Sequence, residues 1–272
     1  MTGPALFLRV YFRAHAWTLT NKVTMIKSTK VGSKYDTNIS VAGGVEDFAS
    51  VIRYFQADIN GHRDRSFLGG RTSEAAERYE IAWRRLFYSQ HSDRQQQLLR
   101  EAITSDELSL SEKYFVLYLQ LVAQSTLFHD ITRDVLLKAV FSGRSTITKE
   151  DVLSYMRFLK SNSPEDMPWS ESTMSRAAII YLGVLSKLGI CSGAPKSTLR
   201  ELHVPYLSDA LFIYFIRWSQ AVCEDRTIHN PYLPFAFLDN QMLTIRLKKI
   251  EYMPLWDIYQ IGQEITIEIK ES

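Results

Sequence analysis

Cysteine, long apolar runs and glycine-rich motifs are all scarce in this chain. Among 272 residues there are two cysteines, Cys191 and Cys223, too few for a disulfide framework and without CxxC or metal-ligand spacing. We therefore expect reduced thiols and a cytoplasmic protein. The most apolar run, residues 114–129, is 16 residues long and contains Gln120 and Gln124, so it predicts a buried core helix and no membrane span.

Signatures of catalysis and of metal binding are absent as well. No HExxH, GxGxxG, GxxxxGK[ST] or GxSxG pattern occurs. The histidines lie singly along the chain: His15, His62, His91, His129, His203 and His229. His129-Asp130 and Asp134 can bring a carboxylate near an imidazole on one helix, but no convincing nucleophile accompanies them. We predict a non-enzymatic protein without metal or cofactor.

Net charge is also small, at +2, but it is unevenly distributed. Residues 1–100 hold 15 basic and 9 acidic side chains, whereas residues 201–272 hold 6 basic and 10 acidic ones. This asymmetry indicates that an anionic partner meets the first half and selected patches. The near-neutral total predicts modest affinity for such a partner.

Residues 169–204 carry the most informative pattern that is present. Their apolar positions follow helical spacing between Met174 and Leu188, after which Gly189 favours a helix end. Residues 192–195 (SGAP) then break an extended run, as a hairpin loop does. The pattern predicts a winged helix-turn-helix, with a support helix over 147–160 and a recognition helix over 171–188. An ordinary amphipathic helix in a helical domain is the alternative.

The polar face of the predicted recognition helix carries small and basic side chains. Ser172, Ser175 and Arg176 are candidates for contact with a DNA groove. Arginines 84 and 85 lie near a helix end, where they also favour the helix dipole. The predicted phosphate contacts are Arg63, Arg65, Arg71, Arg84, Arg85, Lys187 and Lys196.

Hydrophobic periodicity predicts a mainly α-helical fold: an N-terminal helical bundle and a C-terminal helical region with winged helix-turn-helix-like elements and short β-hairpins. Helices are expected over 45–56, from Ser73 to about Phe87, and over 95–103, 110–127, 131–141, 147–160, 207–222 and 240–251, the last with a strand as alternative. Residues 128–130 are expected to join two of them. A second hairpin is expected over 256–269; its glutamates favour protein packing over DNA contact. The predicted organisation is a non-native or disordered N-terminal extension over 1–24, a helical bundle over 25–145 and a C-terminal helical domain with winged-helix-like elements over 146–272.

Three segments resemble the BrxA family, a component of bacteriophage-exclusion (BREX) defence operons. They are residues 35–40 with Gly43-Gly44, residues 169–173 with Leu185, Leu188 and Gly189, and the 254–270 hairpin. The resemblance covers roughly residues 26–268, and the 24-residue extension departs from it. It implies an all-helical protein with winged elements that binds double-stranded DNA and serves the restriction-methylation machinery of its operon.

Three functional hypotheses follow. The first is a double-stranded DNA-binding accessory protein of phage resistance, with other BREX proteins as further partners. The second is an assembly module that docks other defence proteins, motivated by the acidic last 72 residues. The third is RNA binding by the helical bundle. The sequence leaves the DNA motif and the oligomeric state open.

Overall fold

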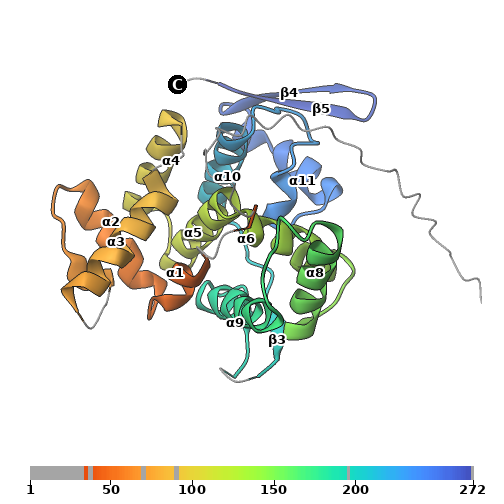
Figure 1. The fold of residues 1–272 in the computed structure, drawn as a ribbon. Helices are drawn as coiled ribbons and strands as arrows, with labels where there is room; N and C mark the ends of the chain where they lie inside the picture. The colour runs from red at the N-terminus through yellow and green to blue at the C-terminus, as the bar shows by residue number, and fades with distance from the viewer. Residues whose placement is uncertain (1–33, 36–38, 69–71, 89–91, 195–196, 271–272) are drawn as a thin grey trace, which may run out of the picture. The chain divides into compact units, whose positions relative to one another are not determined.

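The part of the chain that can be described belongs to one compact unit, Ser33–Ser272. A computed structural model describes residues 34–35, 39–68, 72–88, 92–194 and 197–270, and these are mainly helical, as predicted (Figure 1). The expected extension over 1–24 lies outside the described residues. No described helix combines the length and the apolar character needed to cross a bilayer.

The described residues form α-helices α1 to α11, short helices η1 to η4 and strands β1 to β5. The α-helices are α1 (Ile39–Gly44), α2 (Phe48–Ile59), α3 (Ser73–Tyr88), α4 (Asp93–Thr104), α5 (Leu110–Gln124), α6 (Thr126–Ile131), α7 (Lys138–Phe141), α8 (Lys149–Asn162), α9 (Glu171–Lys187), α10 (Asp209–Val222) and α11 (Asn240–Leu247). Short 3₁₀ helices are η1 (Arg65–Leu68), η3 (Leu233–Ala236) and η4 (Ile250–Tyr252), and η2 (Thr132–Leu137) is a π-helix. The strands are β1 (Thr146–Thr148), β2 (Cys191–Ser192), β3 (Leu199–Leu202), β4 (Trp256–Ile261) and β5 (Glu264–Ile269).

Short side chains define where most of these helices begin. The predicted capping box of α8 is confirmed: Thr148 Oγ1 accepts from the backbone N–H of Asp151 at 3.1 Å, and Asp151 Oδ2 accepts from the N–H of Thr148 at 2.7 Å. Equivalent boxes start α4 and α5. Each satisfies backbone donors that a helix terminus leaves unpaired. The local sequence therefore sets these boundaries.

One hydrophobic core runs through both of the predicted regions, across the expected boundary at residue 145. Fully buried aromatic rings connect the two: Tyr118 and Phe128 have ring centroids 6.1 Å apart, and Phe128 and Tyr181 have centroids 5.2 Å apart. Tyr181 belongs to α9, so α9 is packed directly against the α5–α6 region. Edge and tilted ring contacts of this kind add to the stabilisation from burial alone.

A three-stranded antiparallel sheet combines a strand that precedes α8 with two strands that follow α9. The strand order is β1-β3-β2, with Ile147 opposite Arg200 and Cys191 opposite Leu202. Both helices therefore lie between the first strand and the β2–β3 hairpin in the chain. The hairpin over 191–202 was predicted, whereas β1 has only three residues and depends on pairing with β3.

The C-terminal hairpin is confirmed. Strands β4 and β5 pair from Trp256–Ile269 to Ile261–Glu264, and Gly262 takes a positive φ of 62° in the turn. Residues 240–247 form a helix and not the alternative strand. The indole Nε1 of Trp256 donates to the carbonyl of Leu247 at 3.1 Å and joins the hairpin to α11.

Two details of the helical prediction are wrong. The break between the central helices lies at Ser125 and not at residues 128–130, because Ser125 is extended and its hydroxyl accepts from the backbone N–H of Phe128. The second is α1, which precedes the expected first helix although Ile39, Gly43 and Gly44 are poor helix formers. Packing against α9 compensates for this weak propensity.

The approach of α1 to α9 leaves no room for a side chain at Gly43. A Cβ there would lie 2.6 Å from Cγ2 of Ile180. We predict that Gly43→Ala lowers the free energy of unfolding by about 1–3 kcal/mol through overpacking. Urea denaturation should show a smaller loss when Gly43→Ala is made in an Ile180→Ala background. Equal losses in both backgrounds would contradict this packing.

Gly183 offers a matched control on α9. A Cβ at Gly183 meets nothing within 4 Å. Gly183→Ala is therefore expected to stabilise the protein by roughly 0.5–1 kcal/mol, since alanine has the better helix propensity.

Candidate nucleic-acid interface

The first turn of α9 is fixed by a serine cap. Ser170 Oγ accepts from the backbone N–H of Thr173 at 3.2 Å and lies 2.9 Å from the hydroxyl of Ser172. Glu171 pairs with Arg157 of α8, and its carboxylate also suits the positive end of the helix dipole. The cap and α8 thus hold the start of α9 while the Ser172 side chain stays exposed.

One stripe of α9 faces solvent. It consists of Ser172, Ser175, Arg176 and Ile179 and is called the α9 stripe below. Ser175 is partly exposed, Ser172 and Arg176 are exposed, and Ile179 has 51% of its surface exposed. Arg176 forms no ion pair with any residue that the structure describes. The structure thus brings together the three predicted groove contacts and adds an apolar side chain.

Lys187, at the other end of α9, has a structural role. Its Nζ donates to the backbone carbonyls of Gly43 at 2.9 Å and Val45 at 2.6 Å. These carbonyls end α1, where a cation is stabilised by the helix dipole. Partial burial lowers the pKa of the Lys187 ammonium group. The side chain predicted to contact phosphate therefore faces α1.

The base of the β2–β3 loop is held by Arg200. This side chain is 5% exposed, and its Nη1 donates to the carbonyls of Ala194 at 2.8 Å and Ser197 at 2.7 Å. Gly193 has a φ of 151°, and a Cβ there would lie 3.0 Å from the carbonyl oxygen of Leu199. The predicted contact Lys196 lies outside the described residues.

Acidic partners neutralise two arginines that belong to α8 or precede it. Arg157 pairs with both Glu150 and Glu171, and Arg144 pairs with Asp151 at 2.9 Å. These are exposed or partly exposed pairs, which contribute little to stability. Their consequence is electrostatic. The charges of Arg157 and Arg144 are balanced by carboxylates, whereas the charge of Arg176 is not balanced by any described residue.

Three of the predicted N-terminal arginines pair with two carboxylates, the partly buried Asp58 and the buried Glu80. Arg84 donates to both oxygens of Asp58, at 2.7 and 2.9 Å, and Arg63 lies 3.3 Å from the same carboxylate. Arg65 lies 2.5 Å from Glu80, which is only 4% exposed. The sequence does not reveal these carboxylates as partners, because Asp58 and Arg84 are 26 residues apart and show no local pattern.

These ion pairs also set the ionisation of Glu80. Burial opposes its charged form, but hydrogen bonds from Tyr54 and Arg65 outweigh burial and lower the pKa of this carboxyl group. The Tyr54 hydroxyl donates to Glu80 at 2.8 Å. Arg65 is thus bound to a permanent acceptor inside the protein.

The N-terminal arginines and the α9 stripe occupy different parts of the fold. Helix α1 contacts both α3 and α9, and Figure 1 shows α2 and α3 on one side of α1 and α9 on the other. Arg85 is exposed on α3, and Arg71 lies outside the described residues. The described candidates therefore form two groups and not one continuous surface.

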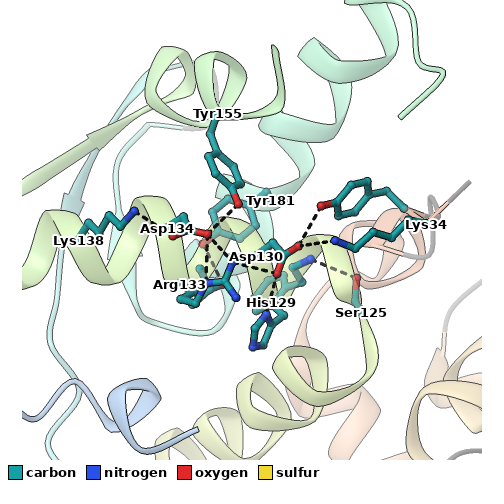
Figure 2. Close-up of polar contacts among 12 residues, drawn as sticks. Lys34, Ser125, His129, Asp130, Arg133, Asp134, Lys138, Tyr155 and Tyr181 are labelled. Atoms are coloured by element: carbon teal, nitrogen blue, oxygen red, sulfur yellow. Dashed lines mark hydrogen bonds and ion pairs between the residues drawn. The ribbon is translucent and has the colours of Figure 1, made fainter. Parts of the chain in front are cut away.

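A network of charged side chains contacts α8 through Tyr155. It lies on α6 and on the π-helix η2, where Asp130 accepts from the Tyr35 hydroxyl at 3.0 Å and lies 3.0 Å from His129 Nδ1 (Figure 2). Asp134 accepts from Arg133 at 2.6 Å and from the Tyr155 hydroxyl of α8 at 2.8 Å. The expected imidazole–carboxylate neighbourhood is confirmed. Its aromatic partners were missed, because they are distant in sequence.

The residues of the network hold Asp134 strongly ionised. Burial opposes ionisation, but hydrogen bonds from Arg133, Lys138 and Tyr155 outweigh it and lower the pKa of Asp134 to about 2. Tyr155 shows the reverse effect, since burial and the Asp134 carboxylate raise its pKa. Both directions favour a neutral tyrosine that donates to a charged aspartate. The arrangement fixes α8 relative to η2.

Among the described residues, no group of three histidine, cysteine, aspartate or glutamate side chains is arranged to hold a metal ion. Cys191 is buried and Cys223 is partly buried, and both are free thiols.

Comparison of the chain with protein-family models, with curated proteins and with solved structures finds no match.

Acid titration tests the role of Asp134. Its folded-state pKa is below the ordinary value of 3.8, so its stabilisation is present above pH 4 and is lost as the pH falls towards 2. We predict that Asp134→Asn costs about 2 kcal/mol of unfolding free energy at pH 7 and little at pH 2. Denaturant unfolding across this range measures the difference. Glu77→Gln, at an exposed position of α3, is the control, and parallel pH curves for the wild type and Asp134→Asn would contradict the assignment.

Proposed function

We propose that residues 126–202 form a winged helix that binds double-stranded DNA, with α9 as the recognition helix and the β2–β3 loop as the wing. The observation that carries the proposal is the β1-β3-β2 sheet, in which α8 and α9 separate the first strand from the hairpin. In helix-turn-helix proteins the second helix of such a pair enters the major groove. The α9 stripe is the exposed part of that helix.

The chemistry of the α9 stripe suits groove contact. An arginine can donate two hydrogen bonds to a guanine, serine hydroxyls can contact bases or phosphates, and an apolar side chain can contact the methyl group of thymine. Arg176, Ser172 and Ile179 supply these three types of group in one row. Ser172 and Ser175 are also small enough to allow close approach of the helix backbone.

The electrostatics favour weak binding with a shallow salt dependence. Arg63, Arg65 and Arg84 are held by carboxylates, and Lys187 is held by α1. Few cations therefore remain to release counterions from DNA. Arg176 is the principal contact in this proposal, and the wing supplies backbone and hydroxyl donors beside it.

The cellular setting is proposed from the BrxA resemblance. The segments that carry it include residues 169–173, which here form the cap and first turn of α9, and the hairpin over 254–270. On this basis the protein is a non-enzymatic, cytoplasmic accessory protein of a BREX defence system. This setting rests on those motif residues alone, whereas DNA binding also has the geometry of residues 126–202 in its support.

Docking of another protein is the second candidate function. The C-terminal hairpin exposes Ile261 to 83% and Tyr259 to 52%, and Ile179 of the α9 stripe is also apolar. Exposed apolar side chains favour protein contact more than phosphate contact. Co-purification with operon partners that survives nuclease treatment and high salt would support this alternative.

Substitution of Arg176 tests DNA binding directly. Fluorescence anisotropy with a labelled duplex should show saturable binding at low salt and a loss of about tenfold or more in affinity for Arg176→Ala, as expected for a lost arginine–base contact. Arg78→Ala, at an exposed arginine of α3, is the matched control and should bind as the wild type does.

The salt dependence gives a second readout of the same experiment. Between about 50 and 200 mM salt, log K should fall by roughly 0.9 per phosphate contact for each unit of log salt concentration. A folded protein that binds no duplex at low salt would overturn the proposal. Unchanged binding by Arg176→Ala would overturn the assignment of α9.

A further inference from the structure

A cavity of about 880 Å³ lies between α4, α10 and the end of β5. Its volume falls within the range of roughly 300–1,000 Å³ that is usual for small-molecule sites. The residues that line it are mostly polar: Arg94, Gln97, Glu101, Arg217, Gln220, Ala221, Glu224, Arg226, Ile269 and Lys270. Its described lining includes no residue of α9.

Three arginines face this cavity without an anionic partner. Arg94 comes from α4, Arg217 from α10 and Arg226 from the loop that follows α10. None of them forms an ion pair with a residue in the described part of the chain. They differ in this respect from Arg63, Arg65 and Arg84, whose carboxylates are described above. The fourth cation, Lys270, is neutralised by Asp257 at 2.8 Å.

Arg217 supplies a second, independent observation that points to a ligand. Its Nε is buried and has no hydrogen-bond partner among the residues that the structure describes. Buried donors of native proteins are almost always paired with protein, water or a bound group. Here the unpaired donor belongs to a residue that lines a cavity, so a ligand oxygen can reach the guanidinium group from that side.

The walls that carry the arginines are held together by hydrogen bonds. Gln220 Nε2 donates to the carbonyl of Ile267 at 2.9 Å, and the backbone N–H of Ile267 donates to the carbonyl of Arg226 at 2.8 Å. These bonds attach α10 and its following loop to β5, while α4 packs along α10. The guanidinium groups are therefore carried by packed elements, which reduces the entropy lost on binding.

We propose that this cavity binds a small, multiply phosphorylated molecule. One guanidinium group can donate two parallel hydrogen bonds to the oxygens of one phosphate. Three such groups therefore suit a ligand with more than one phosphate. The carboxylates of Glu101 and Glu224 can accept hydrogen bonds from hydroxyl groups of such a ligand. Among the described residues, no aromatic side chain lines the cavity to stack a base, so the ligand is recognised through phosphate and hydroxyl groups.

The cavity is separate from the proposed DNA interface. Figure 1 shows α4, α10 and the β4–β5 hairpin in the upper part of the view and α9 in the lower part. A duplex presents its phosphates on an exposed ridge, whereas the Nε of Arg217 is buried. The inference therefore stands independently of DNA binding by α9.

Isothermal titration calorimetry of the full chain with inorganic tripolyphosphate, at about 0.15 M salt, tests the proposal. We expect saturable binding that is weakened about tenfold by Arg217→Gln and by Arg226→Gln, because each removes a charge-assisted contact. Arg226 is exposed, so its variant keeps the test decisive if Arg217→Gln unfolds the protein. Arg100→Gln, at an exposed position of α4 outside the cavity, should bind as the wild type does.

The variants also separate this proposal from the previous one. Arg176→Ala should lose DNA affinity and keep tripolyphosphate affinity, and Arg226→Gln should do the opposite. Absence of tripolyphosphate binding, or binding that Arg217→Gln and Arg226→Gln leave unchanged, would overturn the proposal. Displacement of tripolyphosphate by duplex DNA would also overturn it, and would assign the cavity to a nucleic-acid surface.

Discussion

Helix α9 must be buried on most of its circumference while the α9 stripe remains exposed to solvent. The rest of the fold depends on this constraint. Its Tyr181 is fully buried against Phe128, and the Tyr181 hydroxyl lies 3.1 Å from Thr132 Oγ1 on η2. A polar hydroxyl is tolerated in such a core because it is hydrogen-bonded. Helices α1 and α8 then cover two further flanks of α9, and β2 continues from its end.

The distribution of paired charges decides which surfaces are available to an anionic partner. Arg63, Arg65 and Arg84 are bound to carboxylates, and Lys187 at the end of α9 is bound to backbone carbonyls of α1. These contacts join neighbouring elements and balance the charge of the cations. The described arginines without such partners include Arg176 on α9 and the three in the α4–α10 cavity. The net charge of the chain is nearly zero, so it does not show that paired and unpaired arginines lie on different surfaces.

Local signals in the sequence predicted most of the helical elements. The Thr148–Asp151 capping box, the apolar spacing of α9 and the glycine after Leu188 act within a few residues of one another, so they can be recognised without a structure. Helix α1, strand β1 and the π-helix η2 were missed. Each depends on a partner distant in sequence: α1 on α9, β1 on β3, and η2 on Tyr155 of α8 through Asp134.

The candidate site likewise has some features that local sequence predicts and others that depend on contacts distant in sequence. The sequence by itself determined the position of α9, its polar face and the hairpin after it, because helix periodicity and glycine conformations are local properties. Only the tertiary structure decided which cations of that pattern stay exposed. Arg176 does so, whereas Lys187 meets α1, whose path is set by contacts more than 140 residues away in the chain. The α4–α10 cavity has no local signature, since its three arginines are brought together only by helix packing and by the attachment of β5 to α10.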